Sequence, residues 1–338
     1  MSLKTAFGSR FKMGAAISRK NLNTKQRTDL LLKEFNSFTC ENDMKPMFFL
    51  DEEENLKDPS KYNLSPKLRF DIAVPYLEFA KENNIAMRGH TLVWHNQTPK
   101  WFFHEDYDVN KNFAGRDVML SRLESYIHGV LTFVQENYPG IIYAWDVVNE
   151  IIDEGDFRKS LWNQNVGEDF FIKAFEYARK YADKNVKLFY NDYNTFEEEK
   201  RDLILEKVLK PLMDKGLVDG MGMQSHLVLG EHDLGLYAKA LDIYGKTGLE
   251  IQITELDIHI ADNSEQAMDN LADMYHELFK ILVAAKDDNK ANITSVTFWN
   301  LQDEDSWLTS FRKETSYPLL FHKEGEYKKA YFSVIETA

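Results

Sequence analysis

The stretch Ile141-Ile142-Tyr143-Ala144-Trp145-Asp146-Val147-Val148-Asn149-Glu150 begins as an apolar and aromatic run and ends on an amide and a carboxylate. Strands of a parallel sheet that is covered on both faces are near-continuous apolar runs. Residues 141–150 are therefore predicted to form a buried strand with polar residues at its carboxyl end. Residues 250–258 have the same design and contain Glu255. One such glutamate could be a strand-end salt-bridge residue, but two of them indicate a shared function.

Short apolar runs of this kind alternate with longer amphipathic stretches along the whole chain. The predicted strands lie at residues 12–17, 37–42, 86–94, 141–150, 186–194, 221–227, 250–258 and 294–301. The predicted helices lie at residues 24–35, 65–83, 115–137, 167–183, 197–215, 234–247, 264–288 and 328–337. Eight βα repeats without an intervening linker favour an α/β fold of the (β/α)8 TIM barrel type over an open sheet. The chain is predicted to be a single domain over residues 1–338.

Composition and charge limit the classes of partner. The formal net charge of −14 argues against nucleic acid or an anionic membrane surface and favours a neutral or cationic substrate. Aromatic residues make up 13% of the chain, which suits a protein that binds carbohydrate. Cys40 is the single cysteine, so an intrachain disulfide and a multi-cysteine zinc site are both excluded.

The chain shows no targeting or membrane-spanning segment. No apolar run approaches the ~18 residues of a transmembrane helix. The residues after Met1 lead into no apolar signal-peptide core. A cytoplasmic protein is therefore expected. The alternative is that Met1-Ser2-Leu3 stands in place of a longer native leader.

Chemically active side chains gather at the predicted carboxyl ends of the strands. In chain order they are Glu41, Asn42, Asp43 and Lys45; His90, Trp94 and His95; Asn149 and Glu150; Asn191 to Asn194; Gln224, Ser225 and His226; Glu255 and Asp257; and Trp299, Asp303 and Trp307. In a TIM barrel all of these ends face one mouth, where active sites are built. Each buried polar group costs free energy unless it is paired, so stability alone does not explain the concentration.

Glu150 and Glu255 are the candidate catalytic pair. Their strands are three steps apart around an eight-strand ring, which predicts carboxylates on nearly opposite sides of the mouth. Glycoside cleavage needs one protonated and one ionised carboxyl group, kept apart in pKa by their surroundings. His226 and Thr254 could favour the ionised form of Glu255, with Asp257 holding the imidazole. From the residues alone, the two roles could also be reversed.

Seven segments around these residues occur in the order found in one known family. They are residues 39–45 (TCENDMK), 88–95 (RGHTLVWH), 145–150 (WDVVNE), 190–194 (YNDYN), 224–226 (QSH), 253–257 (ITELD) and 306–308 (SWL). Over roughly residues 11–331 the chain resembles the family 10 glycoside hydrolases, the endo-1,4-β-xylanase family. The absence of a recognisable leader suits an intracellular bacterial member. The resemblance implies the TIM barrel that the strand count predicts.

The resemblance also implies an activity and a set of roles. It implies a retaining xylanase that needs no cofactor or metal, with Glu150 as general acid/base and Glu255 as nucleophile. The substrate would be xylan or xylo-oligosaccharides. The implied substrate-binding residues are Asn149 and Gln224 at the 2-hydroxyl of the cleaved sugar; His226 and Asp257 beside Glu255; His90, Trp94 and Trp299 around the same sugar; Glu41, Asn42 and Lys45 at the next sugar on the non-reducing side; Trp307 over the cleft; and Tyr193 on the leaving-group side.

Three positions depart from the family pattern. Pro46 stands where a tryptophan is usual, which puts in doubt the wall of the distal non-reducing subsites. Asn300 follows Trp299 where glycine is usual, and could shift Trp299. His322 replaces an aspartate and is expected to lie far from the chemistry.

Other functions stay open from the sequence. Within the same class, the substrate could be another β-1,4-glycan such as glucan. A metal-dependent barrel hydrolase could draw its ligands from His90, His95, His226, Glu150, Glu255 and Asp257. A barrel that binds sugar without cleaving it is a third possibility. His95, which has no partner in the sequence pattern, is taken as a structural or surface residue.

Overall fold

All eight predicted strands are present in the computed structural model, which describes residues 1–338. Their bounds are β1 (Lys12–Ile17), β2 (Ser37–Cys40), β3 (Ala86–Trp94), β4 (Ile142–Asn149), β7 (Lys187–Asp192), β8 (Gly220–Met223), β10 (Glu250–His259) and β11 (Asn292–Phe298). The strand predicted at residues 221–227 is broken in two, because Ser225 has a left-handed backbone with φ of 66°. It resumes as β9 (His226–Val228).

The strands divide between two units of the chain. Unit 1 consists of Met1–Glu41, Tyr193–Arg201 and Gly220–Ala338. Unit 2 consists of Asn42–Asp192 and Asp202–Asp219. The assignment of residues 1–338 to one domain stays a prediction.

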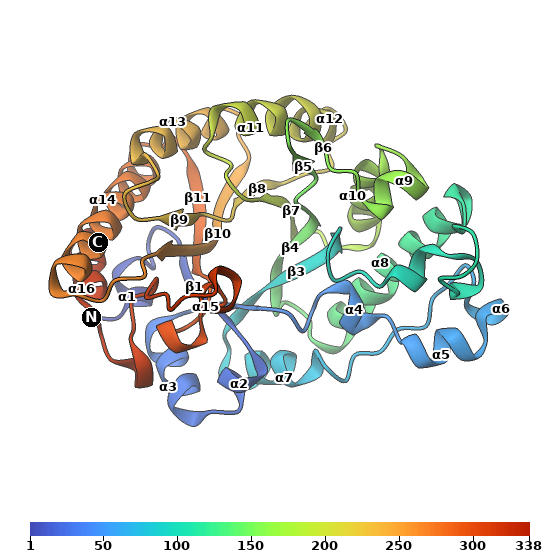
Figure 1. Ribbon diagram of the computed structural model, residues 1–338, viewed down its shortest axis with the longest axis horizontal. Helices are drawn as coiled ribbons and strands as arrows, with labels where there is room; N and C mark the ends of the chain where they lie inside the picture. Colours follow the sequence, from blue (N-terminus) through green and yellow to red (C-terminus); the bar gives the residue numbers. More distant parts are fainter. The chain divides into compact units, whose positions relative to one another are not determined.

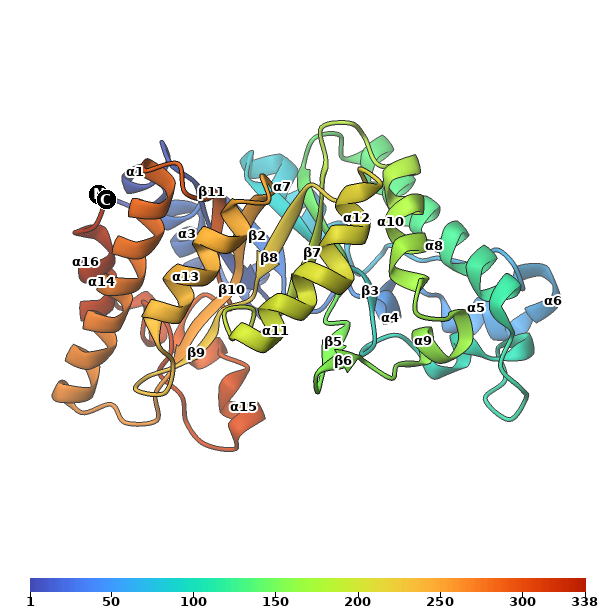
Figure 2. The ribbon, with the colours of Figure 1, turned by 90° about the horizontal axis from the view of Figure 1, so that it is seen from above.

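Unit 1 is built on a parallel sheet in the order β8, β10, β11, β1, β2. Its helical elements are α1 (Leu3–Ala6), α2 (Arg19–Leu22), α3 (Lys25–Glu34), α13 (Leu234–Gly245), α14 (Glu265–Asp287), η4 (Asp303–Asp305), α15 (Leu308–Arg312), η5 (Lys323–Gly325) and α16 (Lys329–Ile335). Helix α14 lies between α13 and α16 and packs on β11, so these helices cover one side of the sheet (Figure 2). Strand β9 extends the sheet beside β10, where Asp257 is opposite His226.

Unit 2 is built on the parallel strands β3, β4 and β7, with β4 in the middle (Figure 1). A hairpin of β5 (Ile152–Asp153) and β6 (Asp156–Phe157) follows β4 directly. The helical elements are α4 (Pro46–Phe49), α5 (Glu52–Lys57), α6 (Pro59–Tyr62), α7 (Val74–Asn83), η1 (Lys100–Phe103), η2 (Glu105–Tyr107), α8 (Arg116–Asn137), α9 (Leu161–Val166), α10 (Phe170–Tyr181), η3 (Ile204–Leu209) and α12 (Lys210–Asp214). Helix α11 (Glu198–Leu203) runs across the boundary between the units.

Two predicted helices differ from the structure. The helix expected over residues 65–83 begins only at Val74, with Pro75 in its first turn. Proline suits a helix start and disfavours the helical conformation in the residue before it. The helix expected over residues 197–215 is divided, because η3 is a π-helical segment between α11 and α12. None of the helices combines the length and the apolar character needed to cross a lipid bilayer.

Trp145 is the central packing residue of unit 2. Its side chain is 1% exposed and lies directly against Gly89 on the neighbouring strand β3. A Cβ atom added to Gly89 would lie 2.2 Å from a carbon of the indole ring, far inside van der Waals contact. The close approach of β3 and the Trp145 ring therefore requires glycine at position 89.

We expect Gly89→Ala to lower the free energy of unfolding by about 1–3 kcal/mol, because it overpacks a filled core. Chemical denaturation of the wild type and the variant measures the difference. In the double variant Gly89→Ala/Trp145→Leu the ring is gone, so the added methyl group should cost much less than it does alone. A Gly89→Ala protein within about 0.5 kcal/mol of the wild type would contradict this packing argument.

Candidate active site

Glu150 occupies a strained backbone position at the end of β4. Its φ is 59°, in the left-handed region that favours glycine. Its N–H donates to the carbonyl of Asn191 at 2.9 Å, and its own carbonyl accepts from Arg158 Nε at 3.0 Å. Such strain persists only where the surroundings fix the backbone, and it clusters at functional sites. Here it turns the chain out of the strand at the carboxylate.

The Glu150 carboxyl group has two aromatic neighbours. Trp94 Nε1 donates to Oε2 at 2.8 Å, and His95 Nδ1 lies 3.9 Å from the same oxygen. Burial, together with the positive charge of Arg158, lowers the pKa of His95 to about 4. His95 is thus uncharged at neutral pH. Neither the indole N–H of Trp94 nor this neutral imidazole places a positive charge beside the Glu150 carboxyl group.

His95 was interpreted from the sequence as a structural or surface residue, and that interpretation stays a prediction. His95 lies beside the candidate acid, and its buried Nδ1 has no hydrogen-bond partner. The signal that could have found it is its place immediately after Trp94, at the end of a strand that carries predicted site residues.

Lys45 lies over the ring of Trp94 and is held there by Asn42. Lys45 is only 5% exposed, and its Nζ lies 4.7 Å from the centre of the Trp94 ring. The same Nζ donates to Asn42 Oδ1 at 2.9 Å. A buried cation needs such compensation, and the indole face and the amide oxygen supply it. Three residues predicted to bind sugar thus form one rigid contact set.

Asp146 fixes His90 from within β4. Arg88 donates to both carboxylate oxygens at 2.9 and 2.5 Å, and His90 Nδ1 lies 2.9 Å from Oδ2. Burial acts to raise the pKa of Asp146, but Arg88 and His90 outweigh it and hold the pKa below its usual value. Next along the strand, the Asn149 side chain accepts from Asn191 Nδ2 at 2.8 Å. His90 and Asn149 are therefore both held in place by buried neighbours.

In unit 1, His226 joins Glu255 to Asp257. His226 Nε2 is 3.1 Å from Glu255 Oε2, and Nδ1 is 2.9 Å from Asp257 Oδ1. Alternate residues of a strand point to the same face, so β10 presents both carboxylates to one imidazole. Burial alone would lower the pKa of His226. The negative charges and hydrogen bonds of the two carboxylates have the larger effect and raise this pKa to about 10. The ring is then a cation at neutral pH, which favours the ionised form of Glu255.

Trp307 is tied to the same network. Its Nε1 donates to Asp257 Oδ2 at 2.9 Å, and its ring centre is 5.0 Å from that of His226. Its backbone N–H donates to the Asn300 side chain at 3.1 Å. Asn300 has φ of 101°, which explains the usual preference for glycine there, and its amide oxygen anchors the backbone of Trp307.

The remaining predicted residues of unit 1 lie next to the ends of strands. Gln224 and Trp299 are 2% and 5% exposed, next to the strands that carry His226 and Glu255. Tyr193 lies under the Lys200 ammonium group, 3.2 Å from the ring centre. Glu41 follows β2, and its N–H donates to the Ile17 carbonyl at 3.0 Å.

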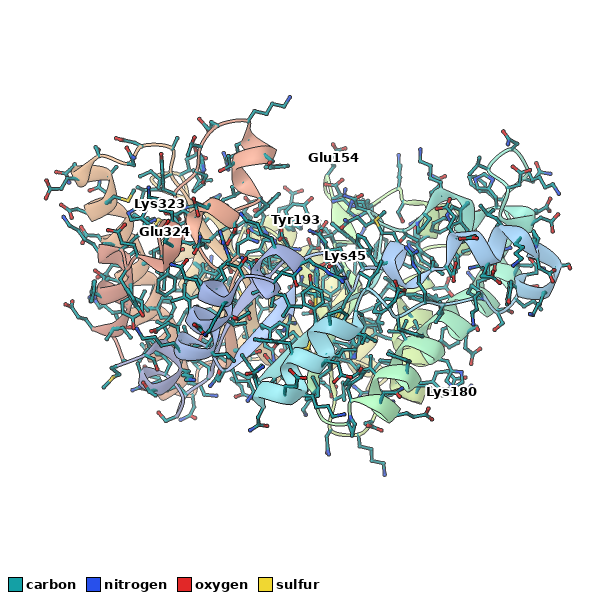
Figure 3. The ribbon with its side chains drawn as sticks, turned by 90° about the horizontal axis from the view of Figure 1, so that it is seen from below. Lys45, Glu154, Lys180, Tyr193, Lys323 and Glu324 are labelled. Carbon is teal, nitrogen blue, oxygen red and sulfur yellow. The ribbon has the colours of Figure 1, made fainter.

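Each unit therefore brings together part of the predicted site. Unit 2 holds Asn42, Lys45, His90, Trp94, Asn149 and Glu150, and unit 1 holds Glu41, Tyr193, Gln224, His226, Glu255, Asp257, Trp299 and Trp307. Figure 3 shows Glu154, from the hairpin after β4, at one end of unit 2 and Lys180 of α10 at the other. Neither unit gathers three His, Cys, Asp or Glu side chains in an arrangement that could hold a metal ion. The roles of the individual residues stay predictions.

Residues 2–337 match the sequence profile of Glycosyl hydrolase family 10. The chain is 66% identical over its full length to endo-1,4-beta-xylanase B of Butyrivibrio fibrisolvens, covering 53% of that protein. It is 40% identical over 99% of its length to endo-1,4-beta-xylanase A of Thermotoga maritima, covering 30% of that protein. The chain thus spans about half, or less, of the length of these relatives.

Solved structures with the same fold cover nearly the whole chain. The N-terminal modules of an endo-1,4-beta-D-xylanase from Clostridium thermocellum, complexed with xylohexaose, match with a TM-score of 0.91 and 38% identity. The match covers 99% of this chain and 67% of that one. An intracellular xylanase from Thermoanaerobacterium saccharolyticum matches with a TM-score of 0.86 and 35% identity over 98% of both chains. The predicted (β/α)8 TIM barrel fold class is confirmed.

The charge on His226 should stabilise the folded protein in a pH-dependent way. Its pKa is raised from 6.5 to about 10, so the contribution is fully present below pH 6.5 and is lost as the pH rises toward 10. We expect the difference in free energy of unfolding between the wild type and His226→Gln to shrink steadily over this interval. Denaturant titrations at several pH values measure it.

If the difference in free energy of unfolding between the wild type and His226→Gln stays constant up to pH 10, His226 is not an imidazolium in the folded protein.

Proposed function

The chain belongs to glycosyl hydrolase family 10, and on that basis we propose that it is a retaining endo-1,4-β-xylanase. It would hydrolyse β-1,4-xylosidic bonds in xylan or xylo-oligosaccharides. The observation that carries the proposal is the contact of Glu255 with a cationic His226, at 3.1 Å, which suits an ionised nucleophile. The xylanases that are similar over the whole chain support the choice of substrate.

In the first step, the Glu255 carboxylate attacks the anomeric carbon and the glycosidic C–O bond breaks. Glu150, in its protonated form, donates its proton to the leaving oxygen. A covalent glycosyl-enzyme forms with inverted configuration. The imidazolium of His226 holds the attacking carboxylate in one orientation, and the indole N–H of Trp94 holds that of Glu150.

In the second step, a water molecule attacks the same carbon and displaces Glu255. Glu150 is now a carboxylate and takes a proton from this water, so both carboxyl groups return to their starting states. The second inversion restores the β configuration, which is retention. The uncharged Trp94 indole and His95 imidazole beside the Glu150 carboxyl group suit a group that must change its charge twice in each cycle.

Known complexes of similar proteins support an extended sugar site. The Clostridium thermocellum modules were solved with xylohexaose. Glutamate-to-alanine mutants of the Thermoanaerobacterium saccharolyticum enzyme were solved with xylotriose and with xylotetraose. We propose the same class of ligand for this chain.

Location and metal independence belong to the proposal as well. A cytoplasmic enzyme would meet imported xylo-oligosaccharides rather than polymeric xylan, and the Thermoanaerobacterium saccharolyticum relative is described as intracellular. Cell fractionation with an antibody against this chain tests the location. Activity that survives exhaustive chelation would support metal independence.

The two catalytic variants should separate the proposed roles. We expect Glu255→Ala to lose about 10⁴-fold or more in kcat on every substrate, because no covalent intermediate can form. Glu150→Ala should lose about 10²–10⁴-fold on xylo-oligosaccharides, which need a proton on the leaving oxygen. With an activated aryl xylobioside it should still release a burst of phenol, because that group leaves without protonation.

Stopped-flow absorbance of the released phenol measures the burst. If both variants lose this first step equally, Glu150 is not the acid. Thermal unfolding of each variant checks that the fold is intact.

The choice between xylan and glucan rests on a direct comparison. We expect the wild type to cleave xylotetraose at least about tenfold more efficiently in kcat/KM than cellotetraose, because one extra or missing group in a fitted pocket changes kcat/KM by about 10–200-fold. Chromatography of the products measures both rates. Equal or faster cleavage of cellotetraose would identify a glucanase instead.

A further inference from the structure

A cavity of about 620 Å³ lies in unit 1 beside the Glu255 network. Glu41 after β2 and Trp307 before α15 both line it, and Ser310 and Phe311 of α15 line it farther along the same short helix. A volume of this size falls in the range of sites that hold small ligands. Trp307 contacts Asp257, which holds His226 beside the proposed nucleophile Glu255. The cavity is therefore linked to the network of Glu255 through the Trp307 side chain.

Phe311 is an exposed aromatic ring with a fixed neighbour. Its side chain is 66% exposed, and its ring centre is 4.8 Å from that of Trp307. The two residues are four positions apart, where side chains on a helix meet. Since Trp307 is anchored at both its ring and its backbone, it gives Phe311 a rigid support. Together they form one apolar wall of the cavity.

The rest of the lining is polar and consists of three serines, three carboxylates and Lys20. Asp305 accepts from Lys20 Nζ at 3.1 Å, from Asn21 Nδ2 at 2.6 Å and from Arg27 Nε at 2.9 Å, so its carboxylate is fixed. Glu41 and Glu304 add two further carboxylates to the lining. A lining that combines aromatic rings with hydrogen-bonding groups fits a sugar ring, which has an apolar face and a hydroxyl edge. The excess of carboxylates disfavours an anionic sugar.

We propose that Phe311 is a binding platform for a neutral sugar ring of the glycan, beyond the sugar that Glu41 contacts on the non-reducing side. A glycan that leaves Glu255 along this wall passes Trp307 first and Phe311 next. The ring at Phe311 is either the next xylosyl unit of the main chain or a neutral branch sugar. The inference rests on the proposed function, because it takes the substrate to be a xylan-type glycan.

Aryl glycosides of increasing length test the platform, because the phenol fixes every sugar on the non-reducing side. We measure kcat/KM of the wild type, Phe311→Ala and Phe311→Trp on aryl xylobioside, aryl xylotrioside and an arabinosyl-substituted aryl xylobioside. Phe311→Ala should lose about three- to tenfold more on a substrate that reaches the platform than on the plain xylobioside, the size of one aromatic contact. Phe311→Trp keeps an aromatic ring at this position, so its kcat/KM on the substrates that reach the platform should stay close to that of the wild type.

Phe332→Ala is the matched control, since Phe332 is also exposed, at 55%, lies on α16 of the same unit and does not line this cavity. A selective loss on the trioside assigns the platform to the main chain, and a selective loss on the substituted bioside assigns it to a branch. An equal effect on all three substrates, or none, would overturn the platform. If the wild type cleaves none of them, the proposed function itself fails, which is a separate result.

Discussion

The contact of one imidazolium with two carboxylates organises unit 1. Glu255 and Asp257 project from the same face of β10, where two negative charges would repel each other. His226 lies between them and gains enough from both to raise its pKa to about 10 despite burial. Trp307 donates its indole N–H to the second carboxylate oxygen of Asp257, so the same network also fixes the position of the indole. The orientation of the proposed nucleophile and the wall of the neighbouring cavity thus have a common origin.

The carboxyl group of Glu150 in unit 2 has different neighbours. Glu150 receives an indole N–H and lies near an imidazole that burial keeps neutral. The nearest charged carboxylate on the strand, Asp146, is neutralised within its own pair with Arg88. The proposed acid thus contacts an uncharged indole N–H and lies near an uncharged imidazole, whereas the proposed nucleophile contacts a cation. This difference in environment supports the proposed division of roles between two chemically identical side chains.

The sequence predicted the strands and the strand-end residues because both leave local patterns. Buried parallel strands are apolar runs, and a glutamate or histidine directly after such a run is conspicuous. The break at Ser225 was missed, because a left-handed backbone at a serine has no compositional signal. The late start of α7 was missed because apolar spacing outweighed Pro75. His95 was set aside because its relation to Glu150 depends on the pairing of β3 with β4, which spacing along the chain does not reveal.

Trp94 and Phe311 differ in how many partners depend on them, and that difference bears on how such a protein can evolve. Trp94 donates to Glu150, supports Lys45 and accepts the indole N–H of Trp162 at its carbonyl, so any replacement disturbs several contacts at once. Phe311 packs on Trp307 with most of its ring in solvent. A substitution at position 311 therefore disturbs a single ring contact, so evolution can change the sugar preference at that rim more easily than it can replace Trp94.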